Sequence, residues 1–393
     1  MRIRYSAENN GRPVKKAVVY TQDEHGINFA DVDTDAVYIT ERLRANGYET
    51  YIVGGAVRDL MLGKKPKDFD IVSGASPSRI KKIFRNARII GRRFRLVHVY
   101  FGPKTFEVST FRSLKDGPTS NTFGTIEEDV FRRDFSLNAL FYDPGKQVVV
   151  DYVGGMKDIR NKRIRPIIPL SVIFKDDPVR MIRAIKYAAA TGFKLPLGLR
   201  WKIKRQSPLL ASISPSRLTE EMLKIIQSVS ACRIVESLEA FGLYEYLQPV
   251  ASDMMKKSAV FRIRYLKSLA DLDGTGTPGE ALAALIRDYL EDFVDWDGGV
   301  AENYKNAFFE ARRYVLPINP PRMELDYAVR RIFGEHGITI KKTHFIERGK
   351  PRFSLAEAPG PAEISEGEPK KRRRRRRGRP PGGGEGGPRE GAL

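Results

Sequence analysis

The sequence is poor in the residues that build disulfides, zinc sites and membrane spans. It has one cysteine, Cys232, so it can form neither an intrachain disulfide nor a cysteine-rich zinc site. Its four histidines are widely scattered, which argues against a histidine-based metal site. No apolar run approaches the roughly 18–20 residues that span a bilayer. Residues 1–8 lack the apolar segment of a secretory signal. We therefore expect a cytoplasmic protein without a membrane partner.

Acidic residues are too few to balance the basic ones. The 393 residues include 69 Lys or Arg and 48 Asp or Glu, a formal net charge of +21. The run Lys370–Arg379 holds nine basic residues, so the remainder still carries +12. Such an excess favours a polyanionic partner, because Lys and Arg release counterions when they neutralise phosphates; charge that serves only solubility is the alternative. Nucleic acid fits better than a membrane surface, since no amphipathic anchor or lipidation signal accompanies the charge.

The order of apolar and polar residues predicts an α+β protein with a mixed sheet in its first half. Residues 1–32 are polar and aperiodic, so we expect a loosely ordered extension. Strands and helices alternate over 33–168, whereas about 170–340 has helical periodicity. Residues 349–393 are rich in Pro, Gly, Glu and Arg, and we expect disorder because they cannot bury enough apolar surface to offset the ordering entropy. The length accommodates two or three domains.

Gly, Pro and Asp turns separate the elements that we expect. The predicted strands of the first half are 51–53, 69–72, 87–90, 95–101, 105–111, 138–142 and 148–152, with helices at 37–45, at 56–62 and from Ser76 onward. The predicted helices of the second half are 179–190, 216–227 with Ser216 as its cap, 233–241, 281–289 and 305–314.

The segment 51–71 is the most informative part of the chain. It reads as a buried strand, a diglycine turn, a helix start, a loop and a second strand that carries Asp68 and Asp70. Side chains alternate along a strand, so these carboxylates should point the same way, about 7 Å apart. Two like charges held together repel, and a fold that tolerates them usually neutralises them with a divalent metal.

The diglycine turn has the properties of a phosphate-binding site. Gly54 and Gly55 offer bare backbone N–H groups at a helix N-terminus, and Arg58 follows one turn later. A triphosphate needs both the backbone N–H donors and a cation. A metal site beside a triphosphate site indicates nucleotidyl transfer.

Two-metal nucleotidyl transfer uses three carboxylates around the ions, and Asp68 and Asp70 supply two. Glu107 is the best third candidate by strand geometry, because it alternates with the apolar Phe106 and Val108 and so faces the other side. The alternative is an ordinary solvated glutamate on a strand.

Two arginine-containing segments are further candidates. Arg133 and Asp134 could hold the nucleotide, with guanidinium to phosphate or base; a surface ion pair worth at most about 1 kcal/mol is the alternative. Arg93 and Arg95, on either side of Phe94, could bind nucleic-acid backbone or form a solvated strand edge.

The segment that begins at Asp177 opens a helix. Asp177, Arg180 and Arg183 advance three residues per step and so share one helix face. A carboxylate beside guanidinium groups can read a base edge as paired acceptor and donors. Capping of the helix by Asp177 is a sufficient structural alternative for that residue.

These segments together resemble the class II nucleotidyltransferases of the polymerase-beta superfamily, the family of tRNA nucleotidyltransferases and bacterial poly(A) polymerases. The motifs that carry the resemblance are Val53-Gly-Gly-Ala-Val-Arg-Asp59, Asp68-Phe-Asp70, Phe106-Glu-Val108, Arg132-Arg-Asp-Phe135 and Asp177-Pro-Val-Arg180. The match spans 51–194 closely and fades by about 249. Segments 63–68, 84–96 and 123–128 and the basic C-terminal tail resemble poly(A) polymerases more than CCA-adding enzymes.

The resemblance implies a polymerase-beta-like nucleotidyltransferase head at 33–168, a helical neck that reads the base at 169–235 and a helical RNA-binding body at 236–348. It implies two Mg²⁺ ions at Asp68 and Asp70, with Asp134 or Glu107 completing the carboxylate set. The residues implied around the nucleotide are Gly54, Gly55, Arg58, Arg133, Asp177, Arg180 and Arg183. Lys186 continues the cationic stripe of the neck where many relatives have arginine, and with Arg93 and Arg95 it is a candidate RNA contact.

The implied activity is template-independent addition of AMP from ATP to RNA 3′ ends, as in RNA polyadenylation and turnover. A CCA-adding or A-adding tRNA nucleotidyltransferase is the alternative with the same chemistry. A non-catalytic RNA-binding protein on an inactive transferase scaffold is the alternative from another class, and the intact carboxylates and diglycine argue against it. We make no prediction about protein partners.

Overall fold

The computed structural model describes residues 2–7, 13–91, 96–113, 122–296 and 299–340. These residues belong to one structural unit, 1–345. The predicted basic tail, Arg93 and Arg95 lie outside the described residues.

A single mixed sheet organises the first half of the chain, as the sequence predicted. Its strands are β1 (Arg2–Ala7), β2 (Pro13–Tyr20), β3 (Thr50–Val53), β4 (Asp70–Ser73), β5 (Ala87–Ile90), β6 (Leu96–Phe101), β7 (Lys104–Thr110), β8 (Leu140–Asp143) and β9 (Val148–Asp151). Their order is β1-β2-β9-β8-β3-β4-β7-β6-β5. The pair β4–β7 is parallel, whereas β3 runs antiparallel to both β4 and β8.

The prediction of a loosely ordered extension over residues 1–32 was wrong. Strand β2 joins the sheet by pairing with β9, with Val18 opposite Asp151, and Ala17 is only 2% exposed. A short helix α1 (Gln22–His25) and a 3-10 turn η1 (Phe29–Asp31) follow. The apolar run in β2 is too short to identify a strand alone; its burial depends on β9, more than a hundred residues away in the sequence.

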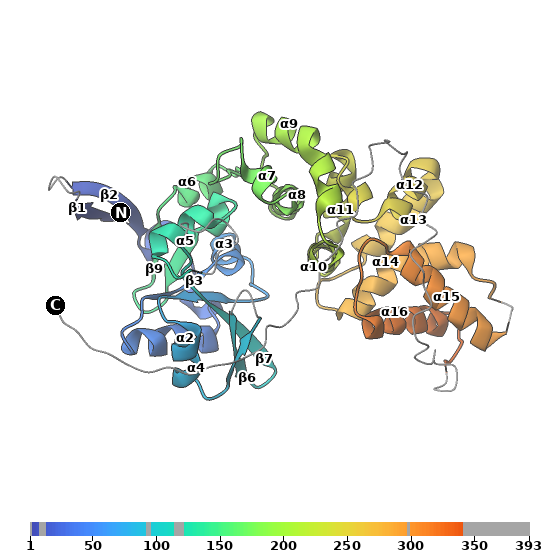
Figure 1. Ribbon diagram of the computed structural model, residues 1–393, viewed down its shortest axis with the longest axis horizontal. Coiled ribbons are helices and arrows are strands. Elements are labelled where there is room, and N and C mark those ends of the chain that lie inside the picture. Colours follow the sequence, from blue (N-terminus) through green and yellow to red (C-terminus); the bar gives the residue numbers. More distant parts are fainter. Residues whose placement is uncertain (1, 8–12, 92–95, 114–121, 297–298, 341–393) are drawn as a thin grey trace, which may run out of the picture. The chain divides into compact units, whose positions relative to one another are not determined.

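Helices cover both faces of the sheet (Figure 1). Figure 1 shows α2 (Thr34–Ala45) and α4 (Pro77–Ile83) on one face, and α3 (Gly55–Met61) and α5 (Ile126–Arg132) on the other. Helix α6 (Gly155–Arg160) and the 3-10 turn η2 (Ser136–Asn138) complete this part.

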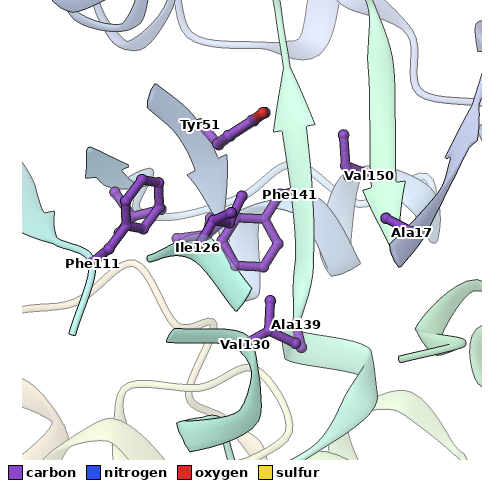
Figure 2. Packing of buried hydrophobic residues seen from close by; sticks show 10 residues of the cluster. Ala17, Tyr51, Phe111, Ile126, Val130, Ala139, Phe141 and Val150 are labelled. Atoms are coloured by element: carbon purple, nitrogen blue, oxygen red, sulfur yellow. The ribbon is translucent and has the colours of Figure 1, made fainter. Parts of the chain in front are cut away.

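The core beneath α5 joins the helix to the central strands. Figure 2 shows Ile126 and Val130 of α5 beside Tyr51 and Phe141 of the sheet. We had predicted no helix at 126–132, although its start is marked: Thr125 and Glu128 form a reciprocal capping box. This packing ties α5, whose end supplies Arg133, to strand β3, which leads into the diglycine turn.

The rest of the described chain is helical, which confirms the predicted α+β class. Its elements are α7 (Ile173–Asp176), α8 (Val179–Thr191), α9 (Leu197–Gln206), η3 (Ser207–Ser212), α10 (Pro215–Ile226), α11 (Ala231–Ala240), η4 (Tyr244–Tyr246), α12 (Pro249–Lys257), α13 (Ala259–Ala270), α14 (Pro278–Phe293), α15 (Val300–Tyr314) and α16 (Arg322–Glu335). None of the described helices combines the length and apolar character needed to cross a bilayer. The boundaries between head, neck and body stay predictions.

One predicted helix start was misplaced. Helix α10 begins at Pro215, with Ser214 rather than Ser216 at the N-cap position. Proline is favoured at the first helical residue because its missing N–H would have no partner there. The cap therefore lies just before the proline.

Candidate active site

The diglycine turn lies directly beside Asp70. Strands β3 and β4 are antiparallel with Val53 opposite Asp70, so the turn that follows Val53 meets the first residue of β4. Gly54 has φ +72° and ψ −133°, a conformation that L side chains rarely adopt. A Cβ atom on Gly54 would also stand 3.5 Å from Oδ2 of Asp70. Glycine is thus required by the backbone, and it leaves the approach to the carboxylate open.

Asp68 differs slightly from its predicted position. It lies in the loop before β4, which starts at Asp70, so strand alternation alone does not orient the pair. The two carboxylates nevertheless interact, because the charge of Asp68 contributes to the raised pKa of Asp70. Both side chains are exposed to solvent.

The carboxyl group of Asp70 has the most perturbed environment of the predicted metal ligands. Although the side chain reaches solvent, the pKa of its carboxyl group is raised from 3.8 to about 6, first by partial desolvation and then by the charges of Glu107 and Asp68. Arg133 acts in the opposite direction. A carboxylate that is both partly desolvated and surrounded by like charge is a favourable ligand for a divalent cation.

Glu107 approaches Asp70 through the parallel pairing of their strands. Ile71 stands opposite Val108, which makes Glu107 the neighbour of Asp70 one step earlier. The Glu107 side chain is 53% exposed, and its Oε1 lies 3.6 Å from Nε2 of His98. Among the described residues no three acidic, cysteine or histidine side chains are close enough to form a complete metal cluster. The charge repulsion within this acidic group is what a bound divalent ion would relieve, so the donor set fits hard cations such as Mg²⁺.

The raised pKa leads to a prediction about stability. Because the folded protein disfavours the charged form of Asp70, the carboxylate destabilises the fold above about pH 6, and this cost vanishes below the usual value of 3.8. Asp70→Asn should therefore raise the melting temperature at pH 8 by roughly 2 °C, a small gain because solvent screens an exposed group. The gain should disappear below pH 4. Thermal melts across pH 3.5–8 without metal test this; a variant less stable than the wild type at pH 8 would contradict it.

Arg58 is fixed against the diglycine turn. Its guanidinium donates to both oxygens of Asp59, at 2.8 and 3.0 Å, and to Oδ1 of Asn138 at 2.9 Å. The guanidinium also stands 5.3 Å from the ring centre of Tyr187. A Cβ atom on Gly55 would lie 3.5 Å from its Nη2. The structure thus places a cation next to the turn, and its contacts fix its orientation before any ligand binds.

Arg133 is also held in place by neighbouring groups. It makes an ion pair of 2.9 Å with Asp129 and donates to the backbone oxygen of Asn138 at 3.1 Å. Asn138 therefore contacts both Arg58 and Arg133, one through its side chain and the other through its backbone. No local sequence pattern signals this bridge, because the role of Asn138 depends on where η2 lies in the fold.

Asp134 is not part of a surface ion pair. It is 6% exposed, its Oδ1 accepts the backbone N–H of Phe135, and its Oδ2 lies 3.2 Å from Nη1 of Arg183. This carboxylate holds the pKa of Arg183 well above its usual value. Because Asp134 faces an arginine of α8, it joins the segment between α5 and η2 to that helix, and Glu107 is the better-placed third carboxylate for a metal.

Asp177 has the capping role that its position suggested, together with a second contact. Its Oδ1 accepts the backbone N–H of Val179 at 3.2 Å, and its Oδ2 pairs with Arg217 of α10 at 2.7 Å. Arg180 is 7% exposed and donates to the backbone oxygen of Ile173 at 3.1 Å. Burial lowers the pKa of its guanidinium. Sequence reasoning missed Arg217, which lies 40 residues from its partner.

Lys186 corrects one of our RNA-contact predictions. Its ammonium pairs with Glu221 of α10, and the side chain is only 12% exposed. Burial lowers the pKa of the ammonium group despite the Glu221 carboxylate. Lys186 is therefore an internal ion-pair partner rather than a surface contact for RNA.

A polar cavity of about 390 Å³ unites most of the predicted residues. Its lining includes Gly54, Gly55, Asp70, Arg133, Asp134, Asp177, Arg180 and Arg183. Asp68, Glu107 and Arg58 are not part of the lining. The lining also includes residues that were not predicted as site residues, namely Arg112, Asp129, Arg132, Asn138 and Tyr187. The cavity is lined by both carboxylates and guanidinium groups, a combination suited to a nucleoside triphosphate and a divalent metal.

Comparison with known proteins agrees with this site. Residues 50–165 match the model of the poly A polymerase head domain, and residues 192–255 match the probable RNA- and SrmB-binding site of polymerase A. Poly(A) polymerase I of Salmonella typhi is 41% identical over 247 residues, which cover 59% of this chain and 53% of that protein. The CCA-adding enzyme of Geobacillus thermodenitrificans is 35% identical over 239 residues, 59% of either chain.

A solved structure shares the fold over most of the chain. The crystal structure of the Bacillus stearothermophilus CCA-adding enzyme in complex with CTP matches with a TM-score of 0.53 and 29% identity, and the match covers 76% of this chain and 82% of that one. The mixed sheet with its diglycine turn and acidic strand is thus a nucleotidyltransferase head.

Over the matched residues the chain is similar to tRNA nucleotidyltransferases and poly(A) polymerases. It spans about half the length of the curated poly(A) polymerases that it matches.

Proposed function

We propose that this protein is a template-independent polynucleotide adenylyltransferase that adds AMP from ATP to RNA 3′ ends. One observation carries the proposal: Asp70, whose pKa is raised by partial desolvation and by the charges of Glu107 and Asp68, stands directly against the diglycine turn. That geometry puts a candidate site for a divalent metal, at Asp70, next to a candidate site for phosphate, at the diglycine turn. The similarity to poly(A) polymerase I at 41–42% identity supports adenylyl transfer in particular.

The reaction forms one bond and breaks one. The RNA 3′-hydroxyl loses its proton and attacks the α-phosphorus of ATP, and the bond to the β-phosphate breaks as pyrophosphate leaves. Asp68 and Asp70, with Glu107, would hold Mg²⁺, which supplies activation of the hydroxyl and neutralisation of charge at the α-phosphate.

The residues around the cavity would position the nucleotide. Backbone N–H groups at the start of α3 and the cation of Arg58 would hold the phosphates, because both are fixed before substrate arrives. Arg133, which lines the cavity, would add a further contact. Preorganised donors of this kind need no rearrangement during the reaction, which makes their interaction with developing charge more effective.

The face of α8 would recognise the base. Asp177 and Arg180 are held by the protein in fixed orientations, and an acceptor beside donors can match the edge of a base. Arg183, which is tied to Asp134, would complete this face.

A CCA-adding or A-adding tRNA nucleotidyltransferase is the second candidate. The fold match to a CCA-adding enzyme favours it, as does the 35% identity to another. The two activities share the same chemistry. They differ in which nucleotide is added and in which RNA receives it.

Nucleotide preference separates the two candidates. The purified full chain should extend a generic RNA with many residues from labelled ATP alone, and should incorporate CTP far less. The measurement supplies ATP or CTP singly, on generic RNA and on tRNA truncated at its 3′ end. Preferred addition of CTP to truncated tRNA would establish the second candidate instead. Binding of RNA with no incorporation of either nucleotide would indicate an inactive scaffold.

Cytoplasmic location and an RNA partner form part of the same proposal. The partner is supported by the match of residues 192–255 to a probable RNA-binding region and by the excess of basic residues.

A further inference from the structure

A long segment of the head carries positive charge without any negative charge. Residues 71–106 contain nine Lys or Arg and no Asp or Glu. The segment includes helix α4 and strands β5 and β6. These two strands form one edge of the sheet, at the end of the strand order away from β9. The nucleotide cavity takes none of its lining from these residues.

Five of these cations are exposed on and after α4. They are Arg79, Lys81, Lys82, Arg85 and Arg88. Helix α4 packs against the sheet through Ile80, which is fully buried, and Phe84 is only 3% exposed. The cations of α4 therefore lie on the side of the helix that faces away from the sheet. Within the described part of the chain, none of the five forms an ion pair.

An aromatic shelf adjoins these cations. Tyr38 of α2 is 45% exposed and meets the rings of Phe84 and Phe101 edge-on, with centroids 6.5 and 5.9 Å apart. The guanidinium of Arg42 stands 5.8 Å from the centre of the Tyr38 ring and donates to its hydroxyl at 3.0 Å. Figure 1 shows α2 and α4 on the same side of the sheet.

An open groove of about 760 Å³ joins the shelf to the cations. Its lining includes Tyr38, Arg42, Lys82, Arg85 and Phe101. Asp35 also lines the groove, but its carboxylate is already paired with Lys104 at 3.0 Å. Asp35 therefore does not neutralise the positive charge of Arg42, Lys82 and Arg85 in the groove.

Clustered cations repel one another, and a bound polyanion removes that repulsion. Exposed aromatic rings among cations add a second requirement, because a nucleobase can stack on the ring only when it is not already stacked in a duplex. The two features together match a single strand of nucleic acid. A membrane surface would need an apolar helix face beside the charge, and α4 buries its apolar side.

We propose that the α2–α4 face of the head, comprising Tyr38, Arg42, Arg79, Lys81, Lys82 and Arg85, binds single-stranded RNA upstream of its 3′ end. This rests on the proposed function, which brings an RNA 3′ end to Asp70. Backbone phosphates contact the cations, and at least one base stacks on Tyr38. The face increases affinity for RNAs long enough to reach it and does not contribute to the chemistry.

A charge-reversal variant tests the face with a matched control. Lys81→Glu/Lys82→Glu/Arg85→Glu changes three exposed cations of the face. Lys146→Glu/Lys157→Glu/Arg163→Glu makes the same change of charge on exposed cations elsewhere in the head. Fluorescence anisotropy measures binding of oligoadenylates of about 6 and about 30 nucleotides over a range of salt concentrations, and thermal melts check folding.

The face variant should bind the long RNA at least tenfold more weakly. Its plot of log affinity against log salt should be shallower by about 2, since each lost phosphate contact on a single strand removes about 0.7. Binding and extension of the short RNA should match the wild type. The control variant should lose markedly less affinity for the long RNA.

Substitutions of the aromatic ring test stacking separately. Tyr38→Ala should weaken binding of the long RNA roughly tenfold, whereas Tyr38→Phe keeps the ring and should bind nearly as the wild type does.

Several outcomes would overturn the proposal. Equal losses in the face and control variants would show that only total charge matters. Equal losses on short and long RNA would place the effect at the nucleotide cavity. Tight binding to phosphatidylserine vesicles, with RNA binding unchanged in the face variant, would identify a membrane instead. If the wild type incorporates no AMP, the catalytic proposal fails, whereas anisotropy still reports on the face.

Discussion

Asp68→Ala and Asp70→Ala are each expected to lower AMP incorporation by at least about a thousandfold while the protein stays folded. Each change removes a ligand from the acidic group, and metal ions contribute several kcal/mol to transition-state stabilisation, where about 1.4 kcal/mol is a factor of ten. Incorporation of labelled ATP into an oligoadenylate primer measures the loss. Both residues are exposed, so no core packing is removed.

A matched control separates this effect from a general change of charge. Asp31→Ala removes an exposed carboxylate from η1 and should leave incorporation unchanged. A thermal shift on adding Mg²⁺ should be seen with the control and be weakened in both active-site variants. If Asp70→Ala still extended the primer at the wild-type rate, the metal role of this strand would be wrong.

Arg183→Met is expected to lower the free energy of unfolding by about 2–3 kcal/mol. The substitution leaves the 6% exposed carboxylate of Asp134 without its charged partner, and breaking a buried pair in this way typically costs about 3–5 kcal/mol. We take a lower value because the Arg183 side chain is itself 34% exposed. Urea denaturation monitored by circular dichroism measures the change.

A double-mutant cycle tests the cause. Asp134→Asn in the Arg183→Met background removes the stranded charge and should recover part of the stability. Arg312→Met, on an exposed position of α15, is the control and should change stability by no more than about 0.5 kcal/mol. Additive effects of the two substitutions would show that the ion pair does not join the segment between α5 and η2 to α8.

Local patterns predicted much of the head and of α8. The strand at 87–90 and the start of α8 at Val179 agree with the structure, because hydrophobic alternation, proline and glycine act on neighbouring residues. The diglycine turn and Asp70 were also identified together, since a two-strand unit of 20 residues contains both. The same reasoning failed where partners are remote, as at β2, which needs β9.

The amino-acid sequence by itself determined the strand–turn–helix unit with its acidic pair, the helical second half and the basic character of the chain, because these depend on backbone preferences and composition over short spans. Only the tertiary structure decided which charges meet. The parallel pairing of β4 with β7 brings Glu107 beside Asp70, and the position of α8 brings Arg183 beside Asp134 in the segment between α5 and η2. The position of α10 allows two further ion pairs, Lys186 with Glu221 and Arg217 with Asp177. An ion pair forms where two side chains are close and poorly solvated, and for residues distant in sequence that closeness is set by the packing of whole elements.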